Sequence, residues 1–560
     1  MKKPVKRRTT FRGSSFGKDY FTMIAQITLM AVFIFRIPLG YIIGDKGMAY
    51  FGLANEIFAV VAGTVAYGLS EAVAMQVRYR MKRGQVKSAG RILKGAVLLG
   101  GGIGLLLSFL LIFTGQALAQ KAMRLAPAGM AVAWMAPAVF FSILTGVFRG
   151  YFQGNGSKRP TMHSQILYVL FLYLGGLAGG MALYGYGKKV AALLQNEDFA
   201  GAYGAMGASI GLVVASVFSF FHLFVLYLIY KNNLKKQAHR EQSRNQDTIL
   251  GALKIVSGTG ILYALYWFPF HVLPLLDQYF FFLKGSRTPL QEGVSFGEYM
   301  GELTALWGAY YGKCEVAIRI VGGFAAMVCL LPIRRIITTL EREENRVARE
   351  KLGIWIHQSA AIAIPAAVFL GVLAEDLTAV LFKGSNEQVV PWLRAGSLVV
   401  VFSVFAMIFT EVLMRNRKLV YMLGTGLAAL ILHLAAIVLL VNTAGLGIMG
   451  VIIAEIVFYG AVTVAGFFLV SHFFQYEQEW IKCFALTIVV SAVSGLLAML
   501  INRLLHTFLG AFLSLVISLA VAIIVYMLLL VVTRAFRREE LDEMAGGRLL
   551  ILLSELLHYT

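Results

Sequence analysis

A small set of ionisable side chains lies inside long apolar runs of this 560-residue sequence. A charged group in such a run costs several kcal/mol and usually faces a protein interior or a water-filled cavity, so these groups are the first candidates for a functional site. They are Arg36, Glu56, Glu71, Asp277, Lys313, Glu315, Arg319, Glu411 and Glu455.

The basic members of this set predict a site for a phosphate group. Guanidinium binds phosphate oxygens in bidentate fashion and ammonium acts as a compact point charge, so Arg36, Lys313 and Arg319 could together hold a diphosphate. Pro38 should bend the chain beside Arg36, as happens where a helix lines a cavity. Glu56 is placed in the same substrate-binding group. The alternatives are snorkelling to a headgroup or an internal salt bridge, for which Glu315 would be the partner of Arg319.

The acidic members predict coupling to a cation, either Na⁺ or H⁺. Asp277 follows Pro269 and Pro274, which should break their helix and free backbone carbonyls as further ligands. Glu411 and Glu455 are added as weaker members of this ion-coupling group. Each of the three carboxylates could instead pair with a neighbouring polar or basic residue.

Other chemistries find no support in the sequence. It has no Walker loop, no nucleophile placed with a base, and no paired carboxylates at enzyme spacing, which predicts a protein that is not an enzyme. The three cysteines and the scattered histidines lack metal-ligand spacing, so no metal and no other cofactor is expected. Its basic residues form no patch interleaved with aromatic residues, which argues against nucleic acid as a partner.

The composition requires lipid as the solvent for most of the chain. Hydrophobic residues make up 59% of the sequence, and the mean hydropathy is +0.75, whereas soluble domains are roughly half apolar. Apolar runs of about 20 residues, enough to cross a hydrocarbon core, recur from end to end. The sequence therefore predicts an all-α membrane protein with membrane lipids around it.

About fourteen spanning helices are expected. Their ranges are 21–43, 51–77, 92–114, 130–149, 161–185, 203–230, 251–283, 308–333, 354–374, 392–414, 420–441, 447–471, 481–502 and 508–532. When the loops are assigned to alternate sides, roughly 37 Lys and Arg lie on the side of the N-terminus and roughly 10 on the other. This asymmetry places both termini in the cytoplasm and predicts a first helix that is retained rather than cleaved.

A weak internal repeat divides the chain into two parallel six-helix lobes. Phe148 and the polar turn 153–159 correspond to Phe409 and the basic turn 415–418, and similar Met-Gly segments occur at 204–210 and 447–453. The expected organisation is a basic cytoplasmic N-terminus (1–20), an N-lobe (21–230), a cytoplasmic linker (231–250), a C-lobe (251–471), two extra helices (472–533) and an amphipathic cytoplasmic tail (534–560).

Phe148-Arg-Gly-Tyr-Phe-Gln-Gly154, followed by Pro160-Thr161 and Ser164-Gln-Ile166, resembles a signature of the relatives of stage V sporulation protein B. That group lies in the multidrug/oligosaccharidyl-lipid/polysaccharide (MOP) flippase superfamily. Shorter matches include Arg36-Ile-Pro-Leu-Gly40 and Tyr311-Gly-Lys313. Tyr168 departs from the pattern, because an acidic residue is common there.

The resemblance implies two lobes around a central cationic cavity in the bacterial cytoplasmic membrane. It also implies movement of a lipid-linked oligosaccharide, or of the peptidoglycan precursor lipid II, by alternating access, with envelope-synthesis enzymes as partners. Arg36 and Lys313 would be basic residues of the cavity, and Asp277 would be the acidic residue of the seventh helix. A cation-coupled multidrug exporter, a membrane-embedded glycan polymerase or ligase, and a non-transporting scaffold for envelope or spore assembly remain alternatives.

Overall fold

The computed structural model describes residues 16–239, 241, 247–289, 292–333, 345–382, 384, 387–416, 418–544 and 546–556. Within these ranges the regular elements are helices, and no strand is found. The predicted all-α class is therefore confirmed. Most of the proposed N-terminal segment 1–20 lies outside the described residues, as do parts of the linker 231–250, of the basic loop near 340 and of the tail.

The helices follow the predicted apolar runs closely. Their bounds are α1 Phe16–Ile34, α2 Arg36–Phe58, η1 Ala59–Gly63, α3 Thr64–Lys82, α4 Val86–Ala117, η2 Leu118–Ala122, η3 Ala126–Ala128, α5 Gly129–Gly154, α6 Arg159–Leu194, α7 Asp198–His239, α8 Ile249–Gly285, α9 Phe296–Ala309, η4 Tyr310–Cys314, α10 Glu315–Leu330, α12 Asn345–Val372, α13 Ala374–Leu381, α14 Val389–Arg415, α15 Leu419–Ile437, η5 Val438–Thr443, α16 Gly447–Phe474, η6 Ile481–Ala485, α17 Leu486–His506, α18 Ala511–Val532, α19 Arg538–Glu543 and α20 Gly547–Leu556.

Twelve helical segments among the described residues are long and apolar enough to cross a membrane. One of them, Met23–Lys82, has 60 residues, which is enough for two crossings at about 20 residues each. The continuous helix from α9 through α10 is a further candidate, and its centre carries Lys313, Glu315 and Arg319. The structure is thus compatible with the fourteen predicted crossings, and the chain is a multi-pass membrane protein.

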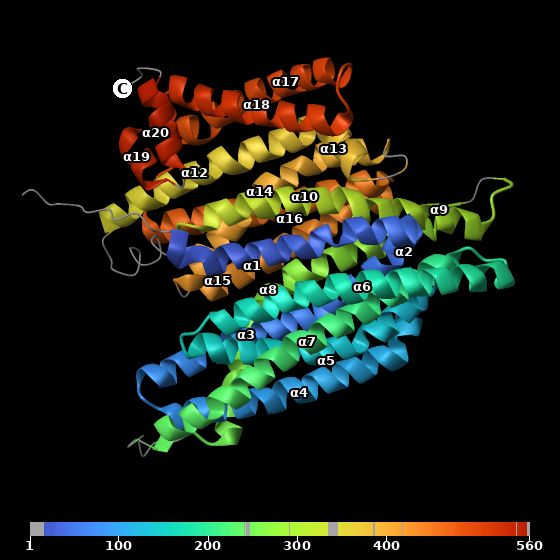
Figure 1. Ribbon diagram of the computed structural model, residues 1–560, viewed down its shortest axis with the longest axis vertical. Helices are drawn as coiled ribbons and strands as arrows, with labels where there is room; N and C mark the ends of the chain where they lie inside the picture. Colours follow the sequence, from blue (N-terminus) through green and yellow to red (C-terminus); the bar gives the residue numbers. More distant parts are fainter. Residues whose placement is uncertain are drawn as a thin grey trace, which may run out of the picture.

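The helices form two groups that lie side by side. In Figure 1 the blue to green helices α3–α7 occupy one half, while α12, α14 and α16 lie in the other half and α17 and α18 cover its far side. Contacts of α2 with α9, α1 with α10, and α3 with α8 join the two halves. We call the end that holds the α3–α4 and α5–α6 turns the basic end, and the end that holds α13 the opposite end.

A short interruption and a turn shape the first part of the chain. Helix α1 ends at Ile34 and α2 begins at Arg36; Pro38 cannot donate a backbone hydrogen bond to the carbonyl of Ile34. Phe35 between them keeps helical angles, φ -53° and ψ -32°. Further on, Gly44 has φ 70° and ψ 175° inside α2, a conformation that only glycine adopts freely. This turn ends the first crossing and starts the second.

Two local predictions about the seventh and eighth crossings are wrong. Helix α8 runs without a break through Pro269 and Pro274, because neighbouring helices can supply the hydrogen bonds that prolines remove from membrane helices. The eighth crossing is predicted to begin at 308, but the chain is already helical from Phe296 onward. Ser295 begins that helix, since its side-chain oxygen accepts a hydrogen bond from the backbone N–H of Glu298.

Candidate functional site

Five ionisable side chains meet between the two halves of the bundle. The guanidinium of Arg36 lies 2.9 Å from Glu315 and 3.6 Å from Glu56. Arg319 lies 3.3 Å from the other carboxylate oxygen of Glu315 and 2.5 Å from Glu455. We call Arg36, Glu56, Glu315, Arg319 and Glu455 the central cluster. Glu315 is its middle member, because it joins an arginine of each half.

Local structure places the members of the central cluster next to one another. Arg36 and Glu56 lie on either side of the Gly44 turn, so the reversal of the chain places them next to each other. Glu315 and Arg319 are four residues apart on α10 and therefore share one helix face. The π-helical segment η4 directly precedes Glu315, and such segments frequently occur at functional sites.

Aromatic side chains enclose the cluster. The Arg36 guanidinium lies 3.8 Å from the ring centroid of Tyr311. Tyr310 donates a hydrogen bond of 3.4 Å to Glu455, and Arg319 donates one of 3.2 Å to the hydroxyl of Tyr459. The space that remains beside the cluster is about 10 Å³, room for about one water molecule. In this conformation the cluster is closed.

Carboxyl groups outnumber guanidinium groups in the central cluster. Two guanidinium groups face three carboxyl groups, and the side chains of Arg36, Glu56, Glu315 and Glu455 are buried. A surplus of positive charge, as the family resemblance implied for the cavity, is therefore absent from these five residues. The internal salt bridge considered from the sequence, Glu315 with Arg319, is present.

The other predicted site residues lie in three different places. Asp277 of α8 lies 2.9 Å from Nε2 of His433 on α15, beside the same small space as the cluster. Lys313 pairs with Asp45 at 3.0 Å, next to the Gly44 turn. Glu411 pairs with Arg415 at 2.6 Å near the basic end. The structure thus brings Arg36, Arg319, Glu56 and Glu455 together, with Asp277 beside them, and places Lys313 and Glu411 elsewhere.

Sequence reasoning missed several polar partners in this region. His433 is fully buried and its Nδ1 lies 2.9 Å from the carbonyl oxygen of Ala454. In the sequence it is one of several scattered histidines, because 156 residues separate it from Asp277 and no local pattern links the two. Tyr310 and Tyr459 were also missed. The signal available for Tyr310 was its position directly before the matched motif Tyr311-Gly-Lys313.

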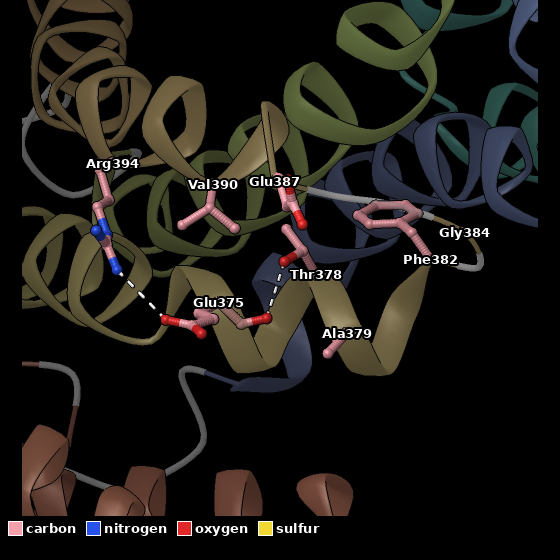
Figure 2. Close-up of a pocket in the computed structure, with 8 residues that line it drawn as sticks. All are labelled: Glu375, Thr378, Ala379, Phe382, Gly384, Glu387, Val390 and Arg394. Carbon is pink, nitrogen blue, oxygen red and sulfur yellow. Dashed lines mark hydrogen bonds and ion pairs between the residues drawn. The ribbon is translucent and has the colours of Figure 1, made fainter.

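A larger pocket lies at the opposite end, away from the cluster. It has a volume of about 670 Å³ and is formed by α13, α14 and the segment between them. Figure 2 shows Arg394 of α14 reaching toward Glu375 of α13, 3.6 Å away. Both side chains are more than half exposed, so this pocket is an open feature of the surface. No sequence pattern predicted it.

Comparisons with known proteins support the predicted resemblance. No family model matches the chain. The chain is 23% identical over 555 residues to stage V sporulation protein B of Bacillus subtilis strain 168, a match that covers 96% of this chain and 99% of that protein. Two similar solved structures are an inward-facing multidrug resistance MATE family transporter of the MOP superfamily and the lipid II flippase MurJ in an inward closed conformation.

These structural matches cover most of each chain. The MATE transporter has a TM-score of 0.60 at 14% identity, over 80% of this chain and 94% of its own. The MurJ flippase has a TM-score of 0.59 at 14% identity, over 92% of this chain and 98% of its own. The resemblance expected from the sequence is therefore confirmed: this chain has the fold of the MOP transporter superfamily and is similar to stage V sporulation protein B over nearly its whole length.

Proposed function

We propose that this protein is a flippase that moves a lipid-linked cell-envelope precursor across the bacterial cytoplasmic membrane by alternating access. The substrate would be lipid II or another polyprenyl-diphosphate oligosaccharide. Segments 21–230 and 251–471 would be the two moving lobes, with 472–533 as an addition to the second lobe and both termini in the cytoplasm. Envelope-synthesis enzymes would supply and use the substrate.

The ion pair between Arg36 and Glu315 carries this proposal. It joins α2 of one lobe to α10 of the other at 2.9 Å, and both side chains are buried. Carboxylate and phosphate both bind guanidinium in bidentate fashion. A diphosphate that enters the cluster can therefore replace Glu315 on Arg36 and release the contact between the lobes.

The remaining cluster residues would support this exchange. Glu315 keeps Arg319 as a partner after Arg36 leaves it, so its charge does not remain buried alone, which would be costly. Arg319 would bind the second phosphate. Glu56 would hold Arg36 in place, and Lys313, now paired with Asp45, would meet the phosphates on the way to the opposite end.

A cation would reset the cycle. Asp277 and Glu455 lie beside the same small space, and we propose that one of them takes up Na⁺ or H⁺ as the lobes return. Glu411 lies near the basic end, where it pairs with Arg415. In this scheme Glu411 would act at the cytoplasmic entrance.

Reconstituted vesicles give the direct test. The purified protein should move a fluorescent polyprenyl-diphosphate sugar between leaflets, measured as the additional fraction of label that a membrane-impermeant quencher reaches. Vesicles with farnesyl diphosphate in excess should show slower movement, because the diphosphate group competes for the same arginines. No movement above that of protein-free vesicles would contradict the proposal and would favour a non-transporting assembly protein.

A cation-coupled multidrug exporter is the second candidate. Four carboxyl groups and several aromatic rings surround the space beside the cluster, and such surroundings also suit an organic cation. The two candidates predict different substrates. Efflux of a cationic dye by cells that produce the protein, without movement of the diphosphate lipid in vesicles, would favour the exporter.

A further inference from the structure

Arg149 is a membrane-embedded cation held outside the central cluster. It lies on α5, five residues before the helix ends at Gly154. Its Nε donates to the hydroxyl of Ser164 on α6 at 2.9 Å, and its Nη2 donates to the hydroxyl of Ser219 on α7 at 3.3 Å. Three helices of the first lobe therefore fix the guanidinium in one position.

Arg149 differs from the other embedded arginines in having no carboxylate partner among the described residues. Arg36, Arg319 and Arg415 each have a carboxylate partner, whereas no described Asp or Glu lies within ion-pair distance of Arg149. Its partners are neutral. Uncompensated charge inside a membrane protein is costly and marks a functional site by default.

The two serines cannot supply the negative charge or the further acceptors that the guanidinium lacks. The hydroxyl of Ser164 donates to the carbonyl oxygen of Thr161, and that of Ser219 donates to the carbonyl oxygen of Ser164, so both hydroxyls are already oriented. A guanidinium has five N–H donors, and these two bonds leave three. Both serines are fully buried, whereas Arg149 is half-buried and keeps some accessible surface.

Aromatic side chains lie near Arg149. The phenol groups of Tyr67 and Tyr168 lie close enough to Arg149 to interact with it electrostatically. Tyr67 is 49% exposed, and its ring packs against Trp267 at 5.4 Å and stacks on His271 at 5.7 Å. Tyr67 belongs to the first lobe and the other two rings to the second, so both lobes contribute to this aromatic group.

The indole N–H of Trp267 also lacks a hydrogen-bond acceptor among the described residues, and its nitrogen is buried. A buried N–H without an acceptor loses stability that a ligand oxygen could restore. The region thus combines an unneutralised guanidinium, an unused indole donor and stacked rings, a combination that suits an anionic group attached to a sugar or an isoprenoid chain.

We propose that Arg149 binds the phosphate of an amphiphilic diphosphate, whose attached group packs on the rings of Tyr67, Trp267 and His271. This inference rests on the proposed function for the identity of the amphiphile. The site lies toward the basic end of the bundle. It would load the substrate before the diphosphate reaches Arg36 and the central cluster.

Binding of farnesyl diphosphate to the purified full chain tests the site without any transport. The fluorescence change on binding should come from Trp267 and be lost in Trp267→Phe. We expect Arg149→Gln, whose amide can still donate to one of the two serines, to weaken binding at least tenfold. Arg149→Lys keeps the charge and should weaken it less. Farnesol, which lacks the diphosphate, should bind equally weakly to the wild type, Arg149→Gln and Arg149→Lys.

The outcomes separate this site from the proposed function. Equal affinity for farnesyl diphosphate in wild type and a folded Arg149→Gln protein would overturn the proposal, and Arg149→Lys serves the same purpose if Arg149→Gln does not fold. Arg394→Ala, which changes an exposed arginine at the opposite end, should keep both the binding and the transport. Normal binding through Arg149 in a protein that moves no lipid would reject the flippase and leave the site standing.

Nanodiscs distinguish two sources of the phosphate. We expect farnesyl diphosphate to bind with the same affinity in discs of neutral lipid and in discs that contain phosphatidylglycerol. If phosphatidylglycerol abolishes the Arg149-dependent binding, the site belongs to bilayer headgroups, and the assignment to a diphosphate substrate is wrong.

Discussion

Replacing Arg36 with alanine should reduce lipid movement in reconstituted vesicles by about a hundredfold or more. Arg36 is proposed to bind the diphosphate through two charge-assisted hydrogen bonds, each worth about 1.5–3 kcal/mol, and about 1.4 kcal/mol corresponds to a factor of ten. Arg36→Lys should fall between this variant and wild type, because ammonium keeps the charge and loses the bidentate geometry. The rate of quencher access to a fluorescent polyprenyl-diphosphate sugar measures the effect.

A matched arginine provides the control for this experiment. Arg394 also pairs with a carboxylate, Glu375, but it is exposed and lines the pocket at the opposite end. Arg394→Ala should move lipid at the wild-type rate. Since removing Arg36 leaves Glu56 without its ion-pair partner, the melting temperature of each variant must be compared as well. A folded Arg36→Ala protein with normal transport would remove Arg36 from the binding site.

Replacing Gly308 with leucine should prevent closure at the opposite end. A side chain at Gly308 of α9 would overlap the backbone carbonyl of Asp45, next to the Gly44 turn of the other lobe. Overpacking costs about 1–3 kcal/mol when neighbours can adjust, and a backbone carbonyl adjusts less than a side chain. The closed state should therefore lose at least a factor of ten in population, and transport should stop because one of its two end states is lost.

Cys314 reports on this change directly. It is fully buried, one residue from Glu315, so a membrane-impermeant maleimide should react with it slowly in the wild type. In Gly308→Leu, with the other two cysteines replaced by alanine, labelling should become at least tenfold faster. Gly297 lies on the same helix with open space around it, so Gly297→Leu is the matched control. Unchanged labelling and transport in Gly308→Leu would show that this contact does not open.

The amino-acid sequence alone is sufficient to predict the helices and several of the cluster residues. Apolar runs of membrane-spanning length determine where helices lie, and an ionisable residue within such a run has few places to face other than the interior. For that reason the residue types and positions of Arg36, Arg319, Glu56 and Glu455 are enough to select them as candidates. Pro38 likewise accounts for the interruption between α1 and α2.

The pairing of those residues could not be predicted, because it depends on how the lobes meet. Glu315 joins Arg36 across 279 positions of the chain, and nothing in either local segment specifies the other. The same limit explains why the sequence groups Lys313 with Arg36, whereas in the structure it pairs with Asp45. Arg149 is the last residue of the predicted helix 130–149, whereas α5 continues to Gly154 and Arg149 donates hydrogen bonds to Ser164 and Ser219.

The central claim is that a diphosphate takes Arg36 from Glu315 and thereby lets the lobes part at the opposite end. Spin labels at Leu193→Cys on α6 and Leu446→Cys before α16 would report on that end of each lobe, because both leucines are exposed and the native cysteines are buried. Adding farnesyl diphosphate should lengthen the distance between the labels in wild type and leave it unchanged in Arg36→Ala. The same distance in wild type with and without bound farnesyl diphosphate would contradict the account.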